Sequence, residues 1–329
     1  MNASAALAPD DPHRSSIVDL GEHLKSRIVG QADFVDKLLI ALLADGHVLL
    51  EGAPGLAKTK AVRLLSEAIE CSQQRVQFTP DLLPSDLTGT DVYRPETGAF
   101  EFVHGPIFHN LVLADEINRA PAKVQSALLE AMAERQVSVG GRTWPLPALF
   151  MVLATQNPIE QEGTYPLPEA QLDRFLLHVR IGFPDLAAER EILHLVRDEA
   201  MGVAPPPHEP LPQAVVFEAR QLALRTFVSP ALEEYVLQLV HATRHPELYG
   251  DDLAGAIEWG ASPRGTLALE RCARVHAWLR GAGYASPADV RAVARDVLGH
   301  RIVPSFEAEA DGLTRERLID ALLERVPVG

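Results

Sequence analysis

Short apolar segments recur through the first half of the chain, each bounded by turn-forming residues. They occupy residues 48–51, 75–78, 111–115, 149–154 and 175–181. Most of these runs are continuously apolar, which is typical of strands covered on both faces of a parallel sheet. Between them, residues 58–69 and 122–134 carry apolar side chains at helical spacing. Because strands and helices alternate, the pattern predicts a three-layer α/β domain over residues 17–182, with a five-stranded parallel sheet.

Two further segments interrupt this alternation and are predicted to be β-hairpins. Residues 91–104 contain two strand patterns joined by a Pro-Glu-Thr-Gly turn. Residues 136–145 repeat the arrangement around the dipeptide Gly140-Gly141, which suits a two-residue hairpin turn. A minimal nucleotide-binding sheet contains neither hairpin. We therefore interpret both as insertions into the α/β domain.

The strand pattern stops after Phe183-Pro184, and helical patterns follow. They occupy residues 186–200, 213–224, 229–245, 263–280, 286–298 and 313–326. Three of these begin with a serine that can cap the helix and a proline suited to its first turn, namely Ser229-Pro230, Ser262-Pro263 and Ser286-Pro287. We therefore expect an all-α domain over residues 183–329. Residues 1–16 carry no signal-like apolar run and are expected to form a disordered tail.

A glycine-rich turn between the first apolar strand and the next helix is the strongest chemical signal. It approximates G-x-x-x-x-G-K-[ST], with alanine at the last glycine position, over Gly52, Ala53, Pro54, Gly55, Leu56, Ala57, Lys58 and Thr59. In such a loop backbone N–H groups face the phosphates, the Lys58 ammonium neutralises their charge, and the Thr59 hydroxyl ligates Mg²⁺. Ala57 keeps the N–H that the loop needs. Lys60 adds a second cation beside the loop, with no role assigned.

Two acidic residues end the buried strand at 111–115, downstream of this loop. Asp115 is placed to hold Mg²⁺ through water, and Glu116 to orient or deprotonate an attacking water. Taken alone, such a pair is more simply a solvated turn. Its position after an apolar strand that follows a phosphate loop favours the catalytic interpretation.

Asn157 ends the next apolar strand, whose carboxyl end lies beside the phosphate loop in a parallel sheet. A neutral amide at this place can fix a water near the γ-phosphate. The sequence Asn157-Pro158 is equally suited to an ordinary turn, so the residues alone leave both interpretations open.

Charge and cysteine content narrow the function classes. The chain has 30 basic and 45 acidic residues among 329, a net charge of −15, which argues against a dedicated DNA or RNA binder but not against a ring with a basic pore. Cys71 and Cys272 lie far apart and are expected to be buried, reduced thiols of a cytoplasmic protein. No segment reaches the roughly 18 apolar residues that a membrane span needs.

Four segments carry a specific resemblance to a known family. They are residues 79–89, 113–121, 154–158 and 162–175, which read TPDLLPSDLTG, LADEINRAP, ATQNP and EGTYPLPEAQLDRF. With the Ala57 variant of the phosphate loop, they resemble the AAA+ ATPases, and within them the MoxR family, over about residues 17–305. The resemblance implies a P-loop AAA+ αβα domain followed by a helical lid. It also identifies the hairpins as resembling the helix-2 insert and the pre-sensor-1 hairpin.

The resemblance also implies roles for single residues. Asn157 is similar to sensor 1, and Arg174 to the arginine finger that reaches the γ-phosphate bound by the neighbouring subunit. Arg264 is similar to sensor 2, expected to sense the γ-phosphate of its own subunit. Gln31 belongs to a segment similar to the one that contacts adenine. Without the resemblance, an ion pair with Asp173 or Glu169 would be the favoured interpretation of Arg174.

These implications define an ATP- and Mg²⁺-dependent ATPase that assembles as a homo-oligomeric ring, expected to be a hexamer. The output implied by the family is chaperone-like remodelling or metal insertion on a separately encoded protein with a von Willebrand type A domain. A magnesium-chelatase-like subunit is an alternative with the same ATPase core. A nucleic-acid motor is a weaker one, because the two predicted hairpins carry few basic residues and the chain is acidic.

Overall fold

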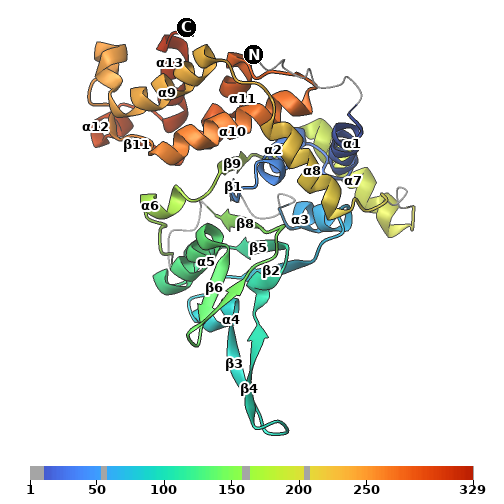
Figure 1. Ribbon diagram of the computed structural model, residues 1–329. Helices are drawn as coiled ribbons and strands as arrows, with labels where there is room; N and C mark the ends of the chain where they lie inside the picture. Colours follow the sequence, from blue (N-terminus) through green and yellow to red (C-terminus); the bar gives the residue numbers. More distant parts are fainter. Residues whose placement is uncertain (1–10, 53–57, 158–163, 204–207, 329) are drawn as a thin grey trace, which may run out of the picture.

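The first helix of the protein begins close to the start of the described chain. The computed structural model describes residues 11–52, 58–157, 164–203 and 208–328 (Figure 1). Helix α1 (Pro12–Arg27) is capped by Asp11, whose side chain accepts from the backbone N–H of His13 at 3.0 Å. Residues 12–16 are therefore helical, and the expected tail over residues 1–16 is too long, because Asp11 and Pro12 provide a cap and a first turn.

Five parallel strands form the central sheet, as predicted. They are β1 (Val48–Gly52), β2 (Gln73–Gln77), β5 (Leu111–Asp115), β8 (Met151–Gln156) and β9 (Leu177–Ile181), in the spatial order β2-β5-β8-β1-β9. The register pairs Gln77 with Asp115 and Gly52 with Ile181. Because all strands run in the same direction, their carboxyl ends meet at one edge of the sheet.

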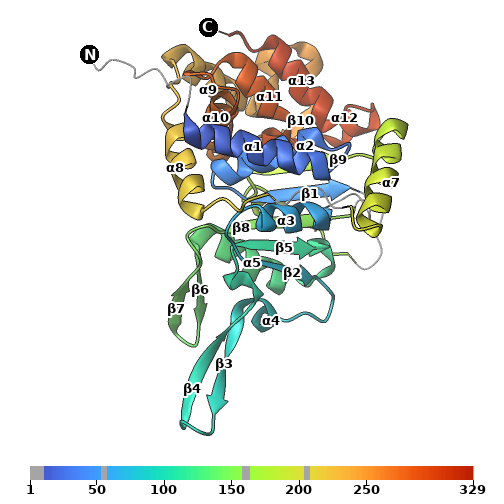
Figure 2. The same cartoon turned by 90° about the vertical axis from the view of Figure 1, so that its right-hand side faces the viewer.

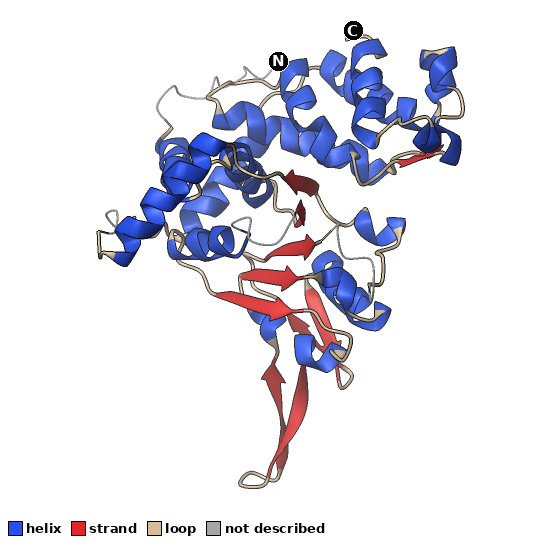
Figure 3. Ribbon diagram, turned by 180° about the vertical axis from the view of Figure 1, so that it is seen from behind, coloured by secondary structure: helices blue, strands red, loops and turns tan. Residues whose placement is uncertain are grey.

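The side chains of alternate residues in the central strands pack into two apolar cores, one on each face of the sheet. On one face, Leu113 and Leu153 pack with α1, α2 (Ala32–Leu43) and α3 (Lys58–Glu67). On the other face, Val112 and Val152 pack with α5 (Ala122–Glu134). This double burial explains why the strands read as continuous apolar runs. Figure 3 shows helices on both sides of the strands.

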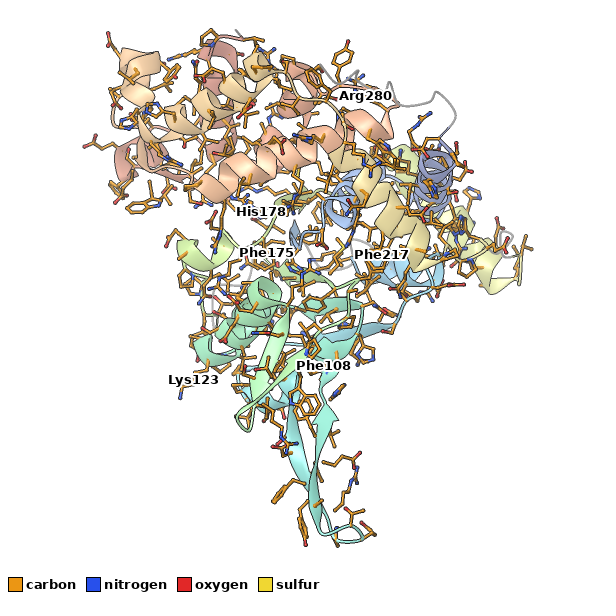
Figure 4. The ribbon with its side chains drawn as sticks, viewed as in Figure 1. Phe108, Lys123, Phe175, His178, Phe217 and Arg280 are labelled. Carbon is orange, nitrogen blue, oxygen red and sulfur yellow. The ribbon has the colours of Figure 1, made fainter. Side chains whose placement is uncertain are left out.

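Both predicted hairpins are present. One consists of β3 (Gly89–Arg94) and β4 (Ala99–His104), and the other of β6 (Gln136–Val139) and β7 (Arg142–Pro145). The first hairpin extends far from the rest of the molecule (Figures 1 and 2). At its base the Phe102 ring stacks on Trp144 of the second hairpin, with centroids 4.6 Å apart, and Phe108 stacks on His104 (Figure 4). Aromatic packing therefore joins the two insertions.

The remaining chain is mostly helical. Its long helices are α7 (Leu186–Ala200), α8 (Gln213–Leu224), α9 (Pro230–Arg244), α10 (Pro263–Leu279), α11 (Pro287–Leu298) and α13 (Arg315–Arg325). Ser229 and Ser262 cap their helices as expected, and Ser286 forms a capping box with Asp289. One short antiparallel pair, β10 (Ile257–Trp259) with β11 (Val303–Pro304), was not predicted, so this part is not purely α-helical.

Several one-turn helices complete the described chain: α4 (Pro84–Thr88), α6 (Glu169–Leu172), α12 (Phe306–Ala310), η1 (Pro106–Phe108), η2 (Ile117–Arg119), η3 (Pro246–Tyr249) and η4 (Asp251–Leu253). The helical part does not sit apart from the sheet, because α8 packs on α1 and α2, and α11 packs on β9. No helix of the described ranges is both long and apolar enough to cross a membrane.

Candidate functional site

A cavity of about 200 Å³ lies at the carboxyl edge of the sheet. It is lined by Lys58, Thr59, Arg75, Gln77, Asp115, Glu116, Thr155 and Asn157. These residues come from the ends of β2, β5 and β8 and from the start of α3. Parallel strands that end at one edge bring segments together that are far apart in sequence. Five predicted site residues therefore share this cavity: Lys58, Thr59, Asp115, Glu116 and Asn157.

Lys58 is the first residue of α3, and its ammonium points back toward β1. Its Nζ donates to the carbonyl of Gly52 at 2.7 Å, and burial lowers the pKa of the ammonium. Gly52 has no room for a side chain, because a Cβ would lie 2.7 Å from the carbonyl oxygen of Ile181. The phosphate contacts predicted for Ala53, Pro54, Gly55, Leu56 and Ala57 fall outside the described residues and stay a prediction.

The two acids are held by a threonine on the neighbouring strand. Thr155 Oγ1 donates to Asp115 Oδ1 at 2.6 Å and accepts from the backbone N–H of Glu116 at 2.9 Å. Glu116 has a φ of 57°, a left-handed conformation that is uncommon for a residue with a side chain. Such strain is often found at functional sites, where the surrounding contacts maintain it. Here the Thr155 hydroxyl is one of those contacts.

Three further side chains contact the acids: Arg75 and Gln77, which were not predicted, and Arg119, which the sequence places beside the acids without a role. Arg75 Nε lies 3.1 Å from Asp115 Oδ2, Gln77 Nε2 donates to Glu116 Oε2 at 2.8 Å, and Arg119 Nε lies 3.0 Å from the same oxygen. For Arg75 and Gln77, the sequence contains a pattern that could have predicted their common location. Residues 75 and 77 alternate along a strand, so their side chains point to the same face of the sheet.

The donors in this cavity fit a magnesium–nucleotide complex. Asp115 and Glu116 supply carboxylate oxygens, and the exposed side chain of Thr59 supplies a hydroxyl. Mg²⁺ binds oxygen ligands and is usually held by one or two carboxylates together with substrate phosphates and water. The Lys58 ammonium supplies the positive charge that phosphate oxygens require. Asn157 is 8% exposed and completes the cavity with a neutral amide.

The two predicted arginines lie elsewhere, in a second cavity of about 390 Å³. Its lining includes Gly46 and His47, which precede β1, and Phe175 and Leu176, which precede β9. The second cavity is therefore at the amino edge of the sheet. A five-residue strand separates the two edges by roughly 16 Å.

Arg174 and Arg264 both line this second cavity, together with Arg135, Arg271 and Arg301. Neither of the two predicted arginines lines the cavity that contains Lys58. The structure therefore does not bring Arg264 to the phosphate cavity of its own subunit, where it was expected to sense the γ-phosphate. The reason is that the start of α10 packs beside α6, at the amino edge of the sheet.

Asp173 pairs with Arg301 and Arg264. Its carboxylate accepts from Arg301 Nε at 2.9 Å and from Ser262 Oγ at 2.8 Å, and Arg264 Nη1 lies 3.6 Å away. Arg174 instead donates from Nη1 to the carbonyl of Leu129 at 2.7 Å. The residues alone favoured an ion pair of Arg174 with Asp173 or Glu169, whereas Asp173 pairs with Arg301 and Arg264. Phe175, labelled in Figure 4, follows this turn; its side chain packs in the core on the α5 face of the sheet, and its carbonyl accepts from Arg301 Nη2 at 2.6 Å.

The remaining predicted residues lie beside α7. Gln31 Nε2 donates to the carbonyl of Gly182 at 3.0 Å, just after β9. Lys60 Nζ lies 3.5 Å from Glu199 Oε1 of α7, and Arg27 pairs with the same carboxylate at 3.3 Å. Neither Gln31 nor Lys60 lines the cavity that contains Lys58. The pair with Glu199 makes Lys60 a contact between α3 and α7.

Two family models match the chain. Residues 47–177 match the ATPase family associated with various cellular activities, and residues 252–322 match the AAA lid domain. The first match contains the carboxyl-edge acids, and the second contains Arg264 and Arg301.

Similar proteins cover nearly the whole chain. Chaperone MoxR1 of Mycobacterium tuberculosis is 48% identical over 92% of this chain and 80% of its own length. Protein MoxR of Paracoccus denitrificans is 36% identical over 93% of this chain and 94% of its own. A crystal structure from Cytophaga hutchinsonii, provisionally assigned as an ATPase, is 43% identical, covers 97% of this chain and 96% of its own, and superposes with a TM-score of 0.89.

Proposed function

Because the chain belongs to the MoxR family of AAA+ ATPases, we propose that it hydrolyses ATP to ADP and phosphate at sites shared between subunits. One observation carries the proposal. The phosphate-binding and acidic residues line a cavity at the carboxyl edge of the sheet, whereas Arg174 and Arg264 line another at the amino edge. A single subunit therefore holds two halves of a site that face in different directions.

Within one subunit, the residues at the carboxyl edge bind the nucleotide phosphates and Mg²⁺ and activate the attacking water. Lys58 neutralises phosphate charge, and Thr59 and Asp115 hold Mg²⁺, which when bound neutralises the charge that develops on the phosphate oxygens. Glu116 orients or deprotonates the attacking water, and Asn157 fixes that water. The contact between Gln77 and Glu116 orients the carboxylate before the reaction. Gln31 contacts the adenine ring beside the end of β9.

The arginines complete the site of the next subunit. Arg174 acts as the finger that reaches the neighbour's γ-phosphate, and Arg264, held beside it by Asp173, acts on the same neighbour. A guanidinium stabilises negative charge that spreads over the transferring phosphoryl oxygens. An arginine supplied across an interface increases the rate by about 10³ to 10⁵ in related phosphoryl transfers. Hydrolysis then depends on assembly, for which we propose a hexameric ring.

The proposed output is chaperone-like remodelling, or metal or cofactor insertion, in the cytoplasm. A similar protein is named a chaperone. The hairpin of β3 and β4 extends away from the ATPase core and is suited to contact a partner. We propose a separately encoded protein with a von Willebrand type A domain as that partner.

The test is the ATPase rate per subunit as a function of protein concentration. We expect the wild-type rate to rise with concentration and to fall by at least a hundredfold in Glu116→Gln and Arg174→Ala. Arg317→Ala, which changes an exposed arginine of α13, is the matched control and should leave the rate unchanged. Adding Glu116→Gln subunits to Arg174→Ala subunits should restore part of the rate, because the first supplies Arg174 and the second supplies Glu116. Full activity of Arg174→Ala alone would contradict shared sites.

A further inference from the structure

Helix α7 is amphipathic, yet none of its residues is buried by the described chain. Leu186, Leu193 and Val196 are spaced to form one stripe along the helix, and they are 73%, 49% and 52% exposed. The opposite side of α7, which includes Ile192 and Leu195, faces the body and is only half-buried. Helices in water derive most of their stability from packing of an apolar face. The described residues therefore leave the stripe without a surface to pack on.

The location of α7 relates the stripe to the nucleotide site. Glu199 of α7 pairs with Lys60, which follows the site residue Thr59 on α3. At the other end of α7, Ala188 packs so closely on Gly30 that a Cβ at Gly30 would lie 2.7 Å from it. A molecule that covers the stripe would therefore lie next to the segments that carry Thr59 and Gln31, two residues of the proposed nucleotide site.

A second exposed apolar surface lies next to the arginines. Leu267 of α10 is 70% exposed and lines the same cavity as Arg174 and Arg264. Trp259, on β10 just before α10, is 68% exposed. The elements that carry this surface lie on the opposite side of the molecule from α7. Figure 1 shows α6 and β11 on the left and α7 on the right, and Figure 3 shows the same separation from behind.

The two helices also carry opposite charge. Helix α7 has four acidic and two basic side chains, a net charge of −2, and α10 has one acidic and three basic side chains, a net charge of +2. Complementary charge favours contact between the two surfaces and disfavours contact of either surface with a copy of itself. This argues against a symmetric pair in which α7 packs on α7. The charge difference favours a head-to-tail contact, in which α7 of each copy meets α10 of the next. Such a contact closes into a ring when the rotation between successive copies is a whole fraction of a turn.

We propose that the stripe of Leu186, Leu193 and Val196 packs against the Leu267 surface of a second copy of this chain. The contact rests on the proposed function and deepens it, because it delivers the neighbour's Arg174 and Arg264 to the nucleotide site beside α7. Helix α7 is thus the receiving surface of the ring interface, and the start of α10 is the delivering surface.

The first test uses one charge substitution on each surface. Leu193→Glu changes the receiving surface and Leu267→Glu changes the delivering surface. Leu237→Glu on α9, where the leucine is 47% exposed, is the matched control. Particle mass is measured by light scattering with Mg²⁺ and a non-hydrolysable ATP analogue. We expect the wild type and Leu237→Glu to form a ring. Leu193→Glu and Leu267→Glu should each be monomeric and at least tenfold less active per subunit.

Both variants should keep their circular dichroism spectrum and bind a fluorescent ATP analogue, because the phosphate cavity lies within one chain. Val196→Glu provides a second change on α7 if Leu193→Glu does not fold. A ring of wild-type mass formed by folded Leu193→Glu and Val196→Glu would overturn the proposal, even if hydrolysis still depended on assembly. A wild type that is active but monomeric at every concentration would overturn the proposed function instead.

Mixing the two variants tests the direction of the contact. Leu193→Glu keeps the delivering surface and Leu267→Glu keeps the receiving surface, so an equimolar mixture should form dimers and recover part of the activity. The active site of such a dimer belongs to the Leu267→Glu copy and uses Arg174 of the other copy. Adding Arg174→Ala to the Leu193→Glu copy should therefore abolish the recovery, whereas adding it to the Leu267→Glu copy should not. No dimer in the mixture, or equal effects of the two additions, would contradict the proposal.

Discussion

The hydroxyl of Thr155 donates a 2.6 Å hydrogen bond to Oδ1 of Asp115, which joins the ends of β8 and β5 at the carboxyl edge of the sheet. The Thr155 hydroxyl oxygen in turn accepts the backbone N–H of Glu116. One buried hydroxyl, 1% exposed, therefore orients the proposed metal ligand and also maintains the left-handed backbone that carries the proposed base. Positioning of this kind determines whether a carboxylate and a water meet in a reactive geometry.

Replacement of Thr155 by valine keeps the side-chain shape and removes the hydroxyl. The Glu116 N–H then lacks its partner in a buried environment, which costs about 1–3 kcal/mol. We expect kcat for ATP hydrolysis to fall by about 10- to 100-fold with a smaller change in nucleotide affinity. Thr155→Ser retains the hydroxyl and is expected to keep most of the activity. Equal kcat values for the valine variant and the wild type, measured at saturating ATP and Mg²⁺, would show that the hydroxyl does not position the acids.

Arg75 competes with a metal ion for Asp115. Its Nη2 and Nε lie 2.5 and 3.1 Å from Asp115 Oδ2, and its side chain is 53% exposed. An exposed ion pair of this kind is worth about 0.5–1 kcal/mol. Arg75→Ala should therefore lower the Mg²⁺ concentration that gives half-maximal ATPase activity by about two- to fivefold. Arg63→Ala, which removes an exposed pair with Glu67 on α3, should not change it. A higher Mg²⁺ requirement in Arg75→Ala would contradict the competition.

Gly52 and Gly182 lie close to the same site but differ in the space around them. A Cβ on Gly52 would lie 2.7 Å from the carbonyl oxygen of Ile181, whereas a Cβ on Gly182 has no neighbour within 4 Å among the described residues. We expect Gly52→Ala to lower the free energy of unfolding by about 1–3 kcal/mol, as overpacking typically does. The same change should also weaken nucleotide binding. Gly182→Ala should be neutral in chemical denaturation and in ATP-analogue binding. Equal stability of the two variants would show that β1 and β9 can separate at no cost.

His47 makes stability depend on pH. It accepts the N–H of Val152 on Nδ1 at 3.0 Å, and burial, followed by the nearby Arg135 guanidinium, lowers its pKa to about 4. Since the unfolded chain takes up this proton near pH 6.5 and the folded chain does not, stability falls as the pH decreases from about 6.5 to about 4. The expected loss attributable to His47 is about 3 kcal/mol.

Urea denaturation at several pH values measures this loss. His47→Gln cannot titrate, so its unfolding free energy should fall less steeply than that of the wild type over this range. His241→Gln, on the exposed side of α9, is the control for replacement of a histidine. Parallel slopes for His47→Gln and the wild type would rule out a contribution from His47.

Local patterns were sufficient for much of the fold and for the common location of Lys58, Thr59, Asp115, Glu116 and Asn157 in one cavity. The continuous apolar runs around Leu113 and Leu153 predicted buried parallel strands because both faces of those strands are covered. Capping pairs such as Ser262-Pro263 marked helix starts through interactions within a few residues. The pairing of β10 with β11 was not predicted, since two- and three-residue strands carry no periodicity, and helices α1 and α2 were not predicted either.

The sequence by itself determined which chemical groups the protein has and the order in which they follow strands and helices. Lys58, Asp115 and Asn157 could be placed at one edge because parallel strands share a direction. The location of Arg264 beside Asp173 depended on how a helix of the second half packs on the sheet. Such packing results from contacts between residues distant in sequence, and no local pattern records it. Only the tertiary structure could therefore decide that the arginines face away from their own phosphate site.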